Sequence, residues 1–406
     1  MKETSTEQMD ASQVFCPNLA CKARGQVGQG NIVSHGKARP RYRCKSCGKT
    51  FSAQAGTMFD GLRKPKTLIV IVVTLLAYGC PIQAIVQAFG LDERTVASWR
   101  DRAGKHCQQV HQAVVQQGQL DLVHVQADEI RVKGCKMIAW MALAMMVPTR
   151  LWLGGVVSLT RDRNLADRLL LQVRACCQPL RALLVCTDGW NAYPGSIRRA
   201  FREKVKAIVG RGRACLRGWP QLCIAVVIKR TEKKRVVTIT RKMVQGTLAQ
   251  AQALLSASHG GTVLNTAFVE RLNGTIRQRL ASLTRKCRHA ARRLAALESG
   301  MWLLGCTYNL CWPHHELSRR ATKAHAGRRA VLLTPAMASG LTDHIWSIQE
   351  LLSYRVAPVA WVAPKRRGRP KKRATPEANG QALTGGQLRL RPLLRLRKGV
   401  LCSTTS

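Results

Sequence analysis

The chain has 406 residues, 46% of them hydrophobic, which is enough for about two or three folded units and excludes a fibrous or wholly disordered protein. The chain has 66 lysines and arginines and only 21 acidic residues, which gives it a formal net charge of +45. This excess disfavours an ordinary enzyme with a small neutral substrate. It indicates a polyanionic partner, most simply nucleic acid, with an anionic membrane surface as the lesser alternative.

The apolar runs at 68–78 and 137–147 are each about half of the ~20 residues that a membrane-spanning helix needs. We therefore expect no membrane insertion. The first residues, Met-Lys-Glu-Thr-Ser, lack the apolar core of a secretory signal, and most of the 16 cysteines lie scattered through apolar segments, as reduced thiols do. The expected location is the cytoplasm, in association with the nucleoid.

Composition divides the chain into successive parts. The expected parts are a flexible N-terminus at 1–15, a zinc ribbon at 16–56, a helix-turn-helix DNA-binding domain at 64–115, an α/β catalytic domain at 120–341 and a disordered basic tail at 358–406.

The ribbon is predicted from two cysteine pairs, Cys16-x4-Cys21 and Cys44-x2-Cys47. Short-spaced pairs on two turns supply the four soft ligands that tetrahedral Zn²⁺ needs. A segment so poor in apolar residues would hardly fold without a metal, which favours a structural site over four unrelated buried thiols.

The helix-turn-helix is predicted at 82–105. Ile82, Ile85, Val86 and Phe89 give one apolar helical face, and Gly90 permits the turn. A second helix, capped by Asp92, would place its apolar residues inward and three polar side chains toward the DNA major groove. The alternative is an ordinary helical hairpin. The inward residues are Val96, Trp99 and Ala103, and the DNA-facing ones are Arg94, Ser98 and Arg102.

The third part alternates between strand-like and helix-like segments. We expect strands at 122–133, 138–147, 151–159, 181–186 and 205–209, helices at 164–176 and 197–204, and a hairpin of 223–229 with 235–240. Three strands, a helix, a strand, a helix and a strand is the order of a ribonuclease-H-like core.

Three acids stand out in this acid-poor domain. Asp128 and Asp188 each end an apolar strand, and Glu270 lies off the apolar stripe of a helix. A carboxylate at the end of a buried strand needs a cation or several donors. The three would hold two Mg²⁺ (or Mn²⁺) ions for phosphodiester chemistry. Pairing with the abundant arginines is the alternative, and Glu129, which we expect to be structural, could replace Asp128 as the ligand.

The sequence resembles the DDE transposases of bacterial insertion sequences, most closely the insertion-sequence-one-like group with an N-terminal zinc ribbon. The resemblance covers about 16–340. It rests on the ribbon, the helix-turn-helix, and the motifs Asp128-Glu129, Thr187-Asp188-Gly189-Trp190, Glu270-Arg271-x-Asn273 and Tyr308-Asn309-x3-Pro313-His314-x2-Leu317.

This resemblance implies an integrase or ribonuclease-H-like core with Asp128, Asp188 and Glu270 as the catalytic, metal-binding triad. It also implies a homo-oligomer on double-stranded DNA that binds terminal inverted repeats and joins element ends to target DNA. One departure is a segment at about 211–262, longer than a minimal core requires, where we expect an inserted hairpin and helix.

Further DNA contacts are predicted near the glutamate and in the tail. Arg271, Asn273 and Arg277 would reach phosphates, unless they only line a solvated helix face. Arg367-Gly368-Arg369-Pro370 resembles the AT-hook core, whose arginines enter a narrow minor groove, although a generic basic tail would also bind DNA.

The sequence thus predicts a Mg²⁺-dependent DNA transposase. The alternatives are a non-enzymatic DNA-binding regulator or domesticated transposase with an inactive core, and a nuclease that never joins strands.

Overall fold

The computed structural model describes residues 10–36, 41–205, 214–233, 235–284, 290–324 and 330–363, and the account below is limited to them. The chain divides into one compact unit, Met1–Trp361, and a second unit, Val362–Ser406. The AT-hook-like segment with Arg367 and Arg369 lies outside the described residues, as do residues 1–9 of the predicted N-terminus.

The N-terminal module is a small antiparallel sheet of order β1-β2-β3. Its elements are the 3-10 helix Ala11–Gln13 and the strands β1 (Ile32–His35), β2 (Arg41–Cys44) and β3 (Thr50–Ser52). Tyr42 and Phe51 stack with ring centroids 5.9 Å apart over a small core that contains the cysteines. A core this small needs a further staple.

Three helices follow, α1 (Lys66–Ala77), α2 (Ile82–Phe89) and α3 (Glu93–Val114). The predicted turn is confirmed: Gly90 has a φ of 60°, and the Asp92 side chain accepts hydrogen bonds from the backbone N–H groups of Arg94 and Thr95. Of the predicted apolar face of α2 only Ile85 is fully buried, and Phe89 is 37% exposed. The inward residues predicted on α3 are all buried.

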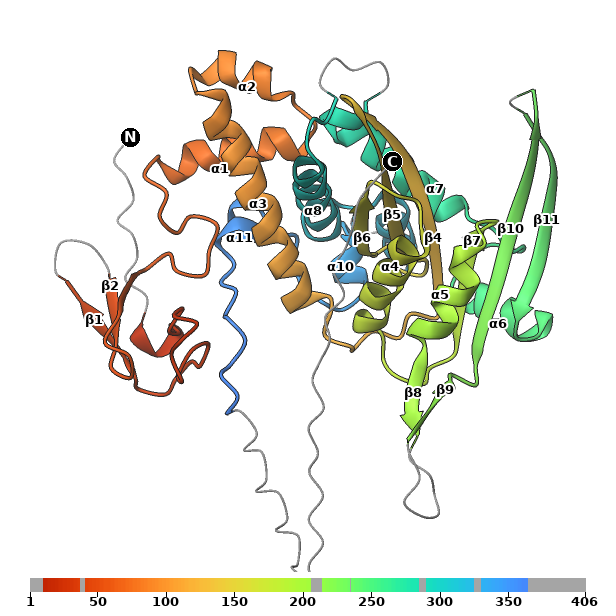
Figure 1. Cartoon of the computed structure of the whole chain (residues 1–406), viewed down its shortest axis with the longest axis horizontal. Coiled ribbons are helices and arrows are strands. Elements are labelled where there is room, and N and C mark those ends of the chain that lie inside the picture. The colour runs from red at the N-terminus through yellow and green to blue at the C-terminus, as the bar shows by residue number, and fades with distance from the viewer. Residues whose placement is uncertain are drawn as a thin grey trace, which may run out of the picture. The chain divides into compact units, whose positions relative to one another are not determined.

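A six-stranded mixed sheet of order β11-β10-β7-β4-β5-β6 forms the centre of the third part (Figure 1). β5 runs antiparallel to its two neighbours β4 and β6, β7 and β10 run parallel to β4, and β11 returns antiparallel at the edge. The strands are β4 (His124–Gly134), β5 (Met137–Met146), β6 (Trp152–Ser158), β7 (Leu183–Asp188), β10 (Leu222–Glu232) and β11 (Arg235–Gln245).

The sequence prediction fails at the fifth core strand. Of the predicted strand at 205–209, only Val205 belongs to the described residues; it ends β8 (Arg202–Val205), which pairs with β9 (Cys215–Gly218) in a separate two-stranded sheet. The place beside β7 belongs to β10, inside the segment that we expected to be an insertion. The reason is burial: residues 222–227 are six consecutive buried residues, as a parallel strand covered on both faces requires, whereas β8 is polar and partly exposed.

Helices cover both faces of the sheet. Successive glycines on β6 show the two faces, because a Cβ at Gly154 would lie 2.3 Å from Gln172 of α4, and one at Gly155 would lie 2.6 Å from Met301 of α8. The helices are α4 (Arg163–Cys176), α5 (Ala192–Ala200), α6 (Leu248–Ala257), α7 (Ala267–Arg279), α8 (Leu294–Leu310), α9 (His315–Ala324), α10 (Pro335–Ala338) and α11 (Ile348–Ser353), with a 3-10 turn at Ala281–Leu283.

Residues after α11 return to the N-terminal module. The Arg355 side chain donates to the carbonyls of Ala53 and Ala55, and the Val356 N–H donates to the carbonyl of Gly56 over 2.9 Å. Pro358 lies against Gly25, where a Cβ would come within 2.1 Å of its carbonyl oxygen. The first residues of the predicted tail are therefore packed in this unit.

Candidate functional site

The four predicted zinc ligands come together in the N-terminal module. The Sγ atoms of Cys16, Cys21, Cys44 and Cys47 all lie within 4.8 Å of one another. Cys16 and Cys47 are 3.7 Å apart, and Cys21 and Cys44 are 3.9 Å apart. Tetrahedral Zn–S bonds of about 2.3 Å place sulfur atoms about 3.8 Å from one another.

The donor set therefore fits a metal ion such as zinc. Burial raises the pKa of the Cys16 and Cys21 thiols, so thiolates at these positions need a bound cation. The backbone N–H of Ala23 points at Cys21 Sγ over 3.4 Å, as the hydrogen-bonding shell of a metal-bound sulfur does. Since four protein ligands fill a tetrahedron, a metal ion held by all four would have no open position for a substrate.

The predicted recognition face of α3 is present in part. Arg94 and Ser98 are exposed on the first turns of the helix. Arg102 is exposed as well, and its guanidinium donates to the carbonyls of Met58 and Asp60, which ties α3 to the preceding segment. Its contact with DNA stays a prediction.

Asp128 and Asp188 lie side by side on two neighbouring parallel strands. Asp188 ends β7 as predicted, whereas Asp128 does not end its strand, because β4 continues to Gly134 through its pairing with β5. The pairing of β4 with β7 runs to Ala127 opposite Thr187, so the two aspartates come next in register and share a face of the sheet. That face is covered by α7, whose Asn273 donates from Nδ2 to Asp128 Oδ2 over 2.8 Å. Carboxylate oxygens of Asp128, Glu129 and Asp188 all lie within 4.8 Å of one another.

Glu129 belongs to this acidic cluster, although we expected a structural role for it. Its carboxylate accepts a hydrogen bond from the Tyr193 hydroxyl over 3.0 Å and pairs with Arg161, which also reaches Asp188 at 3.5 Å. The Arg161 guanidinium lies 5.0 Å from the ring centre of Trp140 and 4.7 Å from that of Trp190. Nothing in the local sequence marks Arg161, whereas Tyr193 follows the Asp188 motif directly.

Glu270 lies near the two aspartates but outside that cluster. Thr266 donates to its Oε1 over 2.5 Å, and the same oxygen pairs with Lys229 of β10. A cavity of about 440 Å³ is lined by both Asp188 and Glu270, together with Arg161, Trp190 and Lys229. The structure therefore brings Glu270 to the same cavity as Asp188.

The acids repel one another in this partly buried place. Burial, then the neighbouring charge of Asp188, raises the pKa of Asp128 to about 6 and that of Glu129 to about 7. Burial also raises the pKa of Asp188, against the N–H of Trp190 and the charge of Arg161. Such a cluster stabilises a bound cation more strongly than separate surface carboxylates do.

The other residues predicted near Glu270 separate into two groups. Arg271 and Arg277 are exposed on α7, as expected for phosphate contacts. Asn273 is only 2% exposed and hydrogen-bonds Asp128, so the prediction that it contacts DNA is wrong. Its partner was hidden from the sequence because the two residues lie 145 positions apart.

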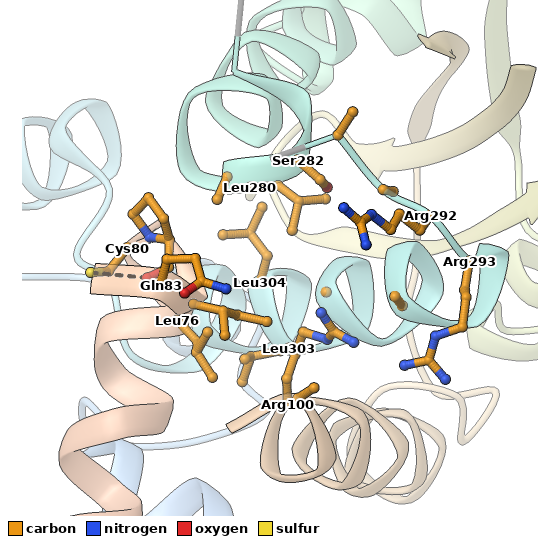
Figure 2. A pocket seen from close by; sticks show the side chains of 18 of the residues that line it. Leu76, Cys80, Gln83, Arg100, Leu280, Ser282, Arg292, Arg293, Leu303 and Leu304 are labelled. Atoms are coloured by element: carbon orange, nitrogen blue, oxygen red, sulfur yellow. Dashed lines mark hydrogen bonds between the residues drawn. The ribbon is translucent and has the colours of Figure 1, made fainter. Parts of the chain in front are cut away.

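Another cavity, of about 400 Å³, lies elsewhere, between α2, α3, α8 and the segment after α7. Figure 2 shows its apolar part, made by Leu76, Leu303 and Leu304, with Arg100 and Arg293 at its side. None of the predicted catalytic acids lines it, so this cavity is separate from the acidic cluster.

No family model matches the chain, and no curated protein matches it. Among the described residues, no helix combines the length and the apolar character that crossing a membrane requires. The function must therefore be argued from the residues and their geometry.

Proposed function

We propose that this chain is an insertion-sequence DNA transposase with a ribonuclease-H-like catalytic domain. Two features support the fold. In the order β6-β5-β4-β7-β10, three strands in antiparallel pairing lie beside two that run parallel to β4. Along the chain, helix α4 follows β6 and helix α5 follows β7. This is the strand arrangement that the resemblance to DDE transposases implies, with β11 as an added edge strand.

The observation that carries the proposal is the juxtaposition of Asp128 and Asp188 on adjacent parallel strands, with Glu270 nearby on α7. These three carboxylates, with Glu129 as a fourth, would hold Mg²⁺ or Mn²⁺, which prefer hard oxygen ligands. Bound there, the metal would lower the pKa of an attacking water or 3′-hydroxyl and stabilise the charge that develops on the leaving oxygen.

The surrounding side chains hold these acids in place. Asn273 donates to Asp128 and so fixes the orientation of its carboxylate. Lys229 forms an ion pair with Glu270, and Arg161 forms ion pairs with both Glu129 and Asp188. Both cations also line the cavity, where they would meet the phosphates of a bound strand.

The N-terminal parts would recognise the element ends. Arg94 and Ser98 are exposed where a recognition helix meets base edges, and Arg41, Arg43, Lys45 and Lys49 are exposed on the cysteine module, which would hold Zn²⁺. The net charge of +45 suits a double-stranded DNA partner. A homo-oligomer on paired ends, in the nucleoid, belongs to the same proposal.

The test uses the full chain, Mg²⁺ and duplex oligonucleotides that tile the DNA on both sides of its coding sequence, with a plasmid as target. We expect cleaved and plasmid-joined strands with the wild type. Asp188→Asn should abolish both products and keep duplex binding. Asp121→Asn is the matched control, since Asp121 is an exposed aspartate that lies outside the acidic cluster.

The outcomes separate the alternatives. Binding without any cleavage would favour the non-enzymatic regulator with an inactive core. Cleavage without joined products would favour a hydrolytic nuclease. Full activity of Asp188→Asn would remove that residue from the mechanism.

A further inference from the structure

A third cavity, of about 290 Å³, lies on the other side of α7 from the acidic cluster. It is lined by residues from four places in the chain, among them Arg150, Phe268, Arg271, His314, Glu316 and Arg320. Because a water molecule takes about 30 Å³, the cavity has room for a group of several heavy atoms.

Arg150 is the unusual residue of this cavity. It is only 4% exposed, yet among the described residues its guanidinium has no carboxylate at ion-pair distance. It donates to the carbonyl of Val147 and lies 3.8 Å over the centre of the Phe268 ring. A buried charge without a counter-ion costs free energy, so a positive group held in this way suits an anion that arrives from outside.

The other charges of the cavity leave an excess of positive charge. Arg271 and Arg320 line it beside Arg150, against the single carboxylate of Glu316. That carboxylate is already shared between Arg320, at 3.0 Å, and Arg319, at 2.9 Å. His314 lines the same cavity, and its Nδ1 is buried without a hydrogen-bond partner among the described residues.

Helix geometry relates this cavity to the acids. At 100° per residue, Glu270 and Asn273 project from one side of α7, whereas Phe268, Arg271 and Thr275 project from another. Asn273 contacts Asp128, and the other three line the basic cavity. The two sites are therefore separated by the width of a helix, about 10 Å, which corresponds to about three nucleotides of axial rise along one DNA strand.

We infer that this cavity, which we call the Arg150 pocket, binds a backbone phosphodiester of the nucleic acid, a few nucleotides away from the phosphate that reacts at the acids. The inference rests on the proposed function, since it assigns this anion to the same DNA substrate. Three guanidiniums with one carboxylate offer the planar donors that phosphate oxygens accept. By holding the strand on the far side of α7, the pocket would position it along the helix that carries Glu270.

The test measures duplex affinity in Mg²⁺-free buffer over a series of salt concentrations. Arg271→Gln and Arg320→Gln should each reduce the slope of log affinity against log salt by about 0.9, the loss of one phosphate contact. Arg319→Gln is the matched control, because Arg319 pairs with the same carboxylate from the same helix but does not line the pocket. Arg150→Gln is avoided, since removing a buried guanidinium stacked on Phe268 threatens the fold.

Equal slopes for Arg320→Gln, Arg271→Gln and Arg319→Gln would overturn the inference. A melting experiment with inorganic phosphate distinguishes the source of the anion. Suppose that phosphate raises the melting temperature of the wild type and not of Arg271→Gln, while the salt slopes for DNA stay equal. The pocket then takes free phosphate, and the assignment to DNA is wrong. Neither readout needs cleavage. A failure of the proposed function would leave the slope changes in place and show no products with any variant.

Discussion

Replacing Asp128 with asparagine should stabilise the Mg²⁺-free protein. Burial and Asp188 raise the pKa of Asp128 from 3.8 to about 6. That difference corresponds to at most about 3 kcal/mol by which ionisation of Asp128 disfavours the folded state at pH 8. Because an asparagine oxygen can still accept the hydrogen bond from Asn273, we expect the free energy of unfolding to rise by about 1–3 kcal/mol and the melting temperature by about 2–5 °C.

The sign of the pH dependence follows from the raised pKa. Since the folded-state pKa lies above the unfolded value, the wild type is relatively stable below pH 4 and loses that advantage as the pH rises through about 6. The gain from Asp128→Asn should therefore be largest near pH 8 and shrink toward pH 5.

The assay is thermal unfolding at both pH values, with and without 10 mM Mg²⁺ as a chosen concentration, and without chelator, which would also attack the cysteine site. Mg²⁺ should raise the melting temperature of the wild type and of the control Asp121→Asn, and not that of Asp128→Asn. A variant that is less stable than the wild type at pH 8 would refute the reasoning, because the acids would then not repel one another in the folded state.

Three further predictions concern other parts of the chain. Cys44→Ser should remove one bound zinc per chain, measured by elemental analysis, whereas Cys215→Ser, an exposed cysteine outside the group, should leave the zinc content unchanged. Arg94→Gln should weaken duplex binding by about 1–3 kcal/mol in fluorescence anisotropy, and Lys105→Gln, exposed farther along α3, should change it less. Burial lowers the pKa of His111 to about 4, so its contribution to stability is present above pH 6.5 and is lost as the pH falls toward 4. Between pH 7 and pH 4.5, the free energy of unfolding of His111→Gln should therefore fall by about 2–3 kcal/mol less than that of the wild type. Denaturant titrations at the two pH values measure this, and equal losses would contradict it.

Local patterns in the sequence predicted much of the fold. The turn at Gly90 and the cap at Asp92 depend on neighbouring residues alone, and both are present. The first three strands of the sheet follow from apolar runs joined by short turns. The fifth strand was misplaced because two segments, 205–209 and β10, both contained apolar residues, and only pairing with β7 distinguishes them.

The candidate site was predictable where an acid follows a buried strand. Asp188 meets this condition at the end of β7, whereas Asp128 lies within β4, one residue beyond its last pair with β7, and the two adjacent parallel strands bring the acids together. Glu129 was harder, because alternation along a strand turns it away from Asp128, toward α5. It joins the cluster beside Asp128, in the part of β4 that continues beyond the last pair with β7 at Ala127.

The partners of these acids could not be predicted, since the choice is made by tertiary contacts alone. The chain carries 66 lysines and arginines, so almost any of them could have faced a given carboxylate. The structure selects Arg161 from the loop after β6 for Glu129 and Asp188, and Lys229 from β10 for Glu270. Among these four acids, only Asp128 has no cation at ion-pair distance within the described residues; its carboxylate accepts from the neutral amide of Asn273 instead. Its repulsion from Asp188 is therefore not offset by an ion pair of its own, and removing its charge, or binding a divalent cation beside it, should stabilise the folded protein.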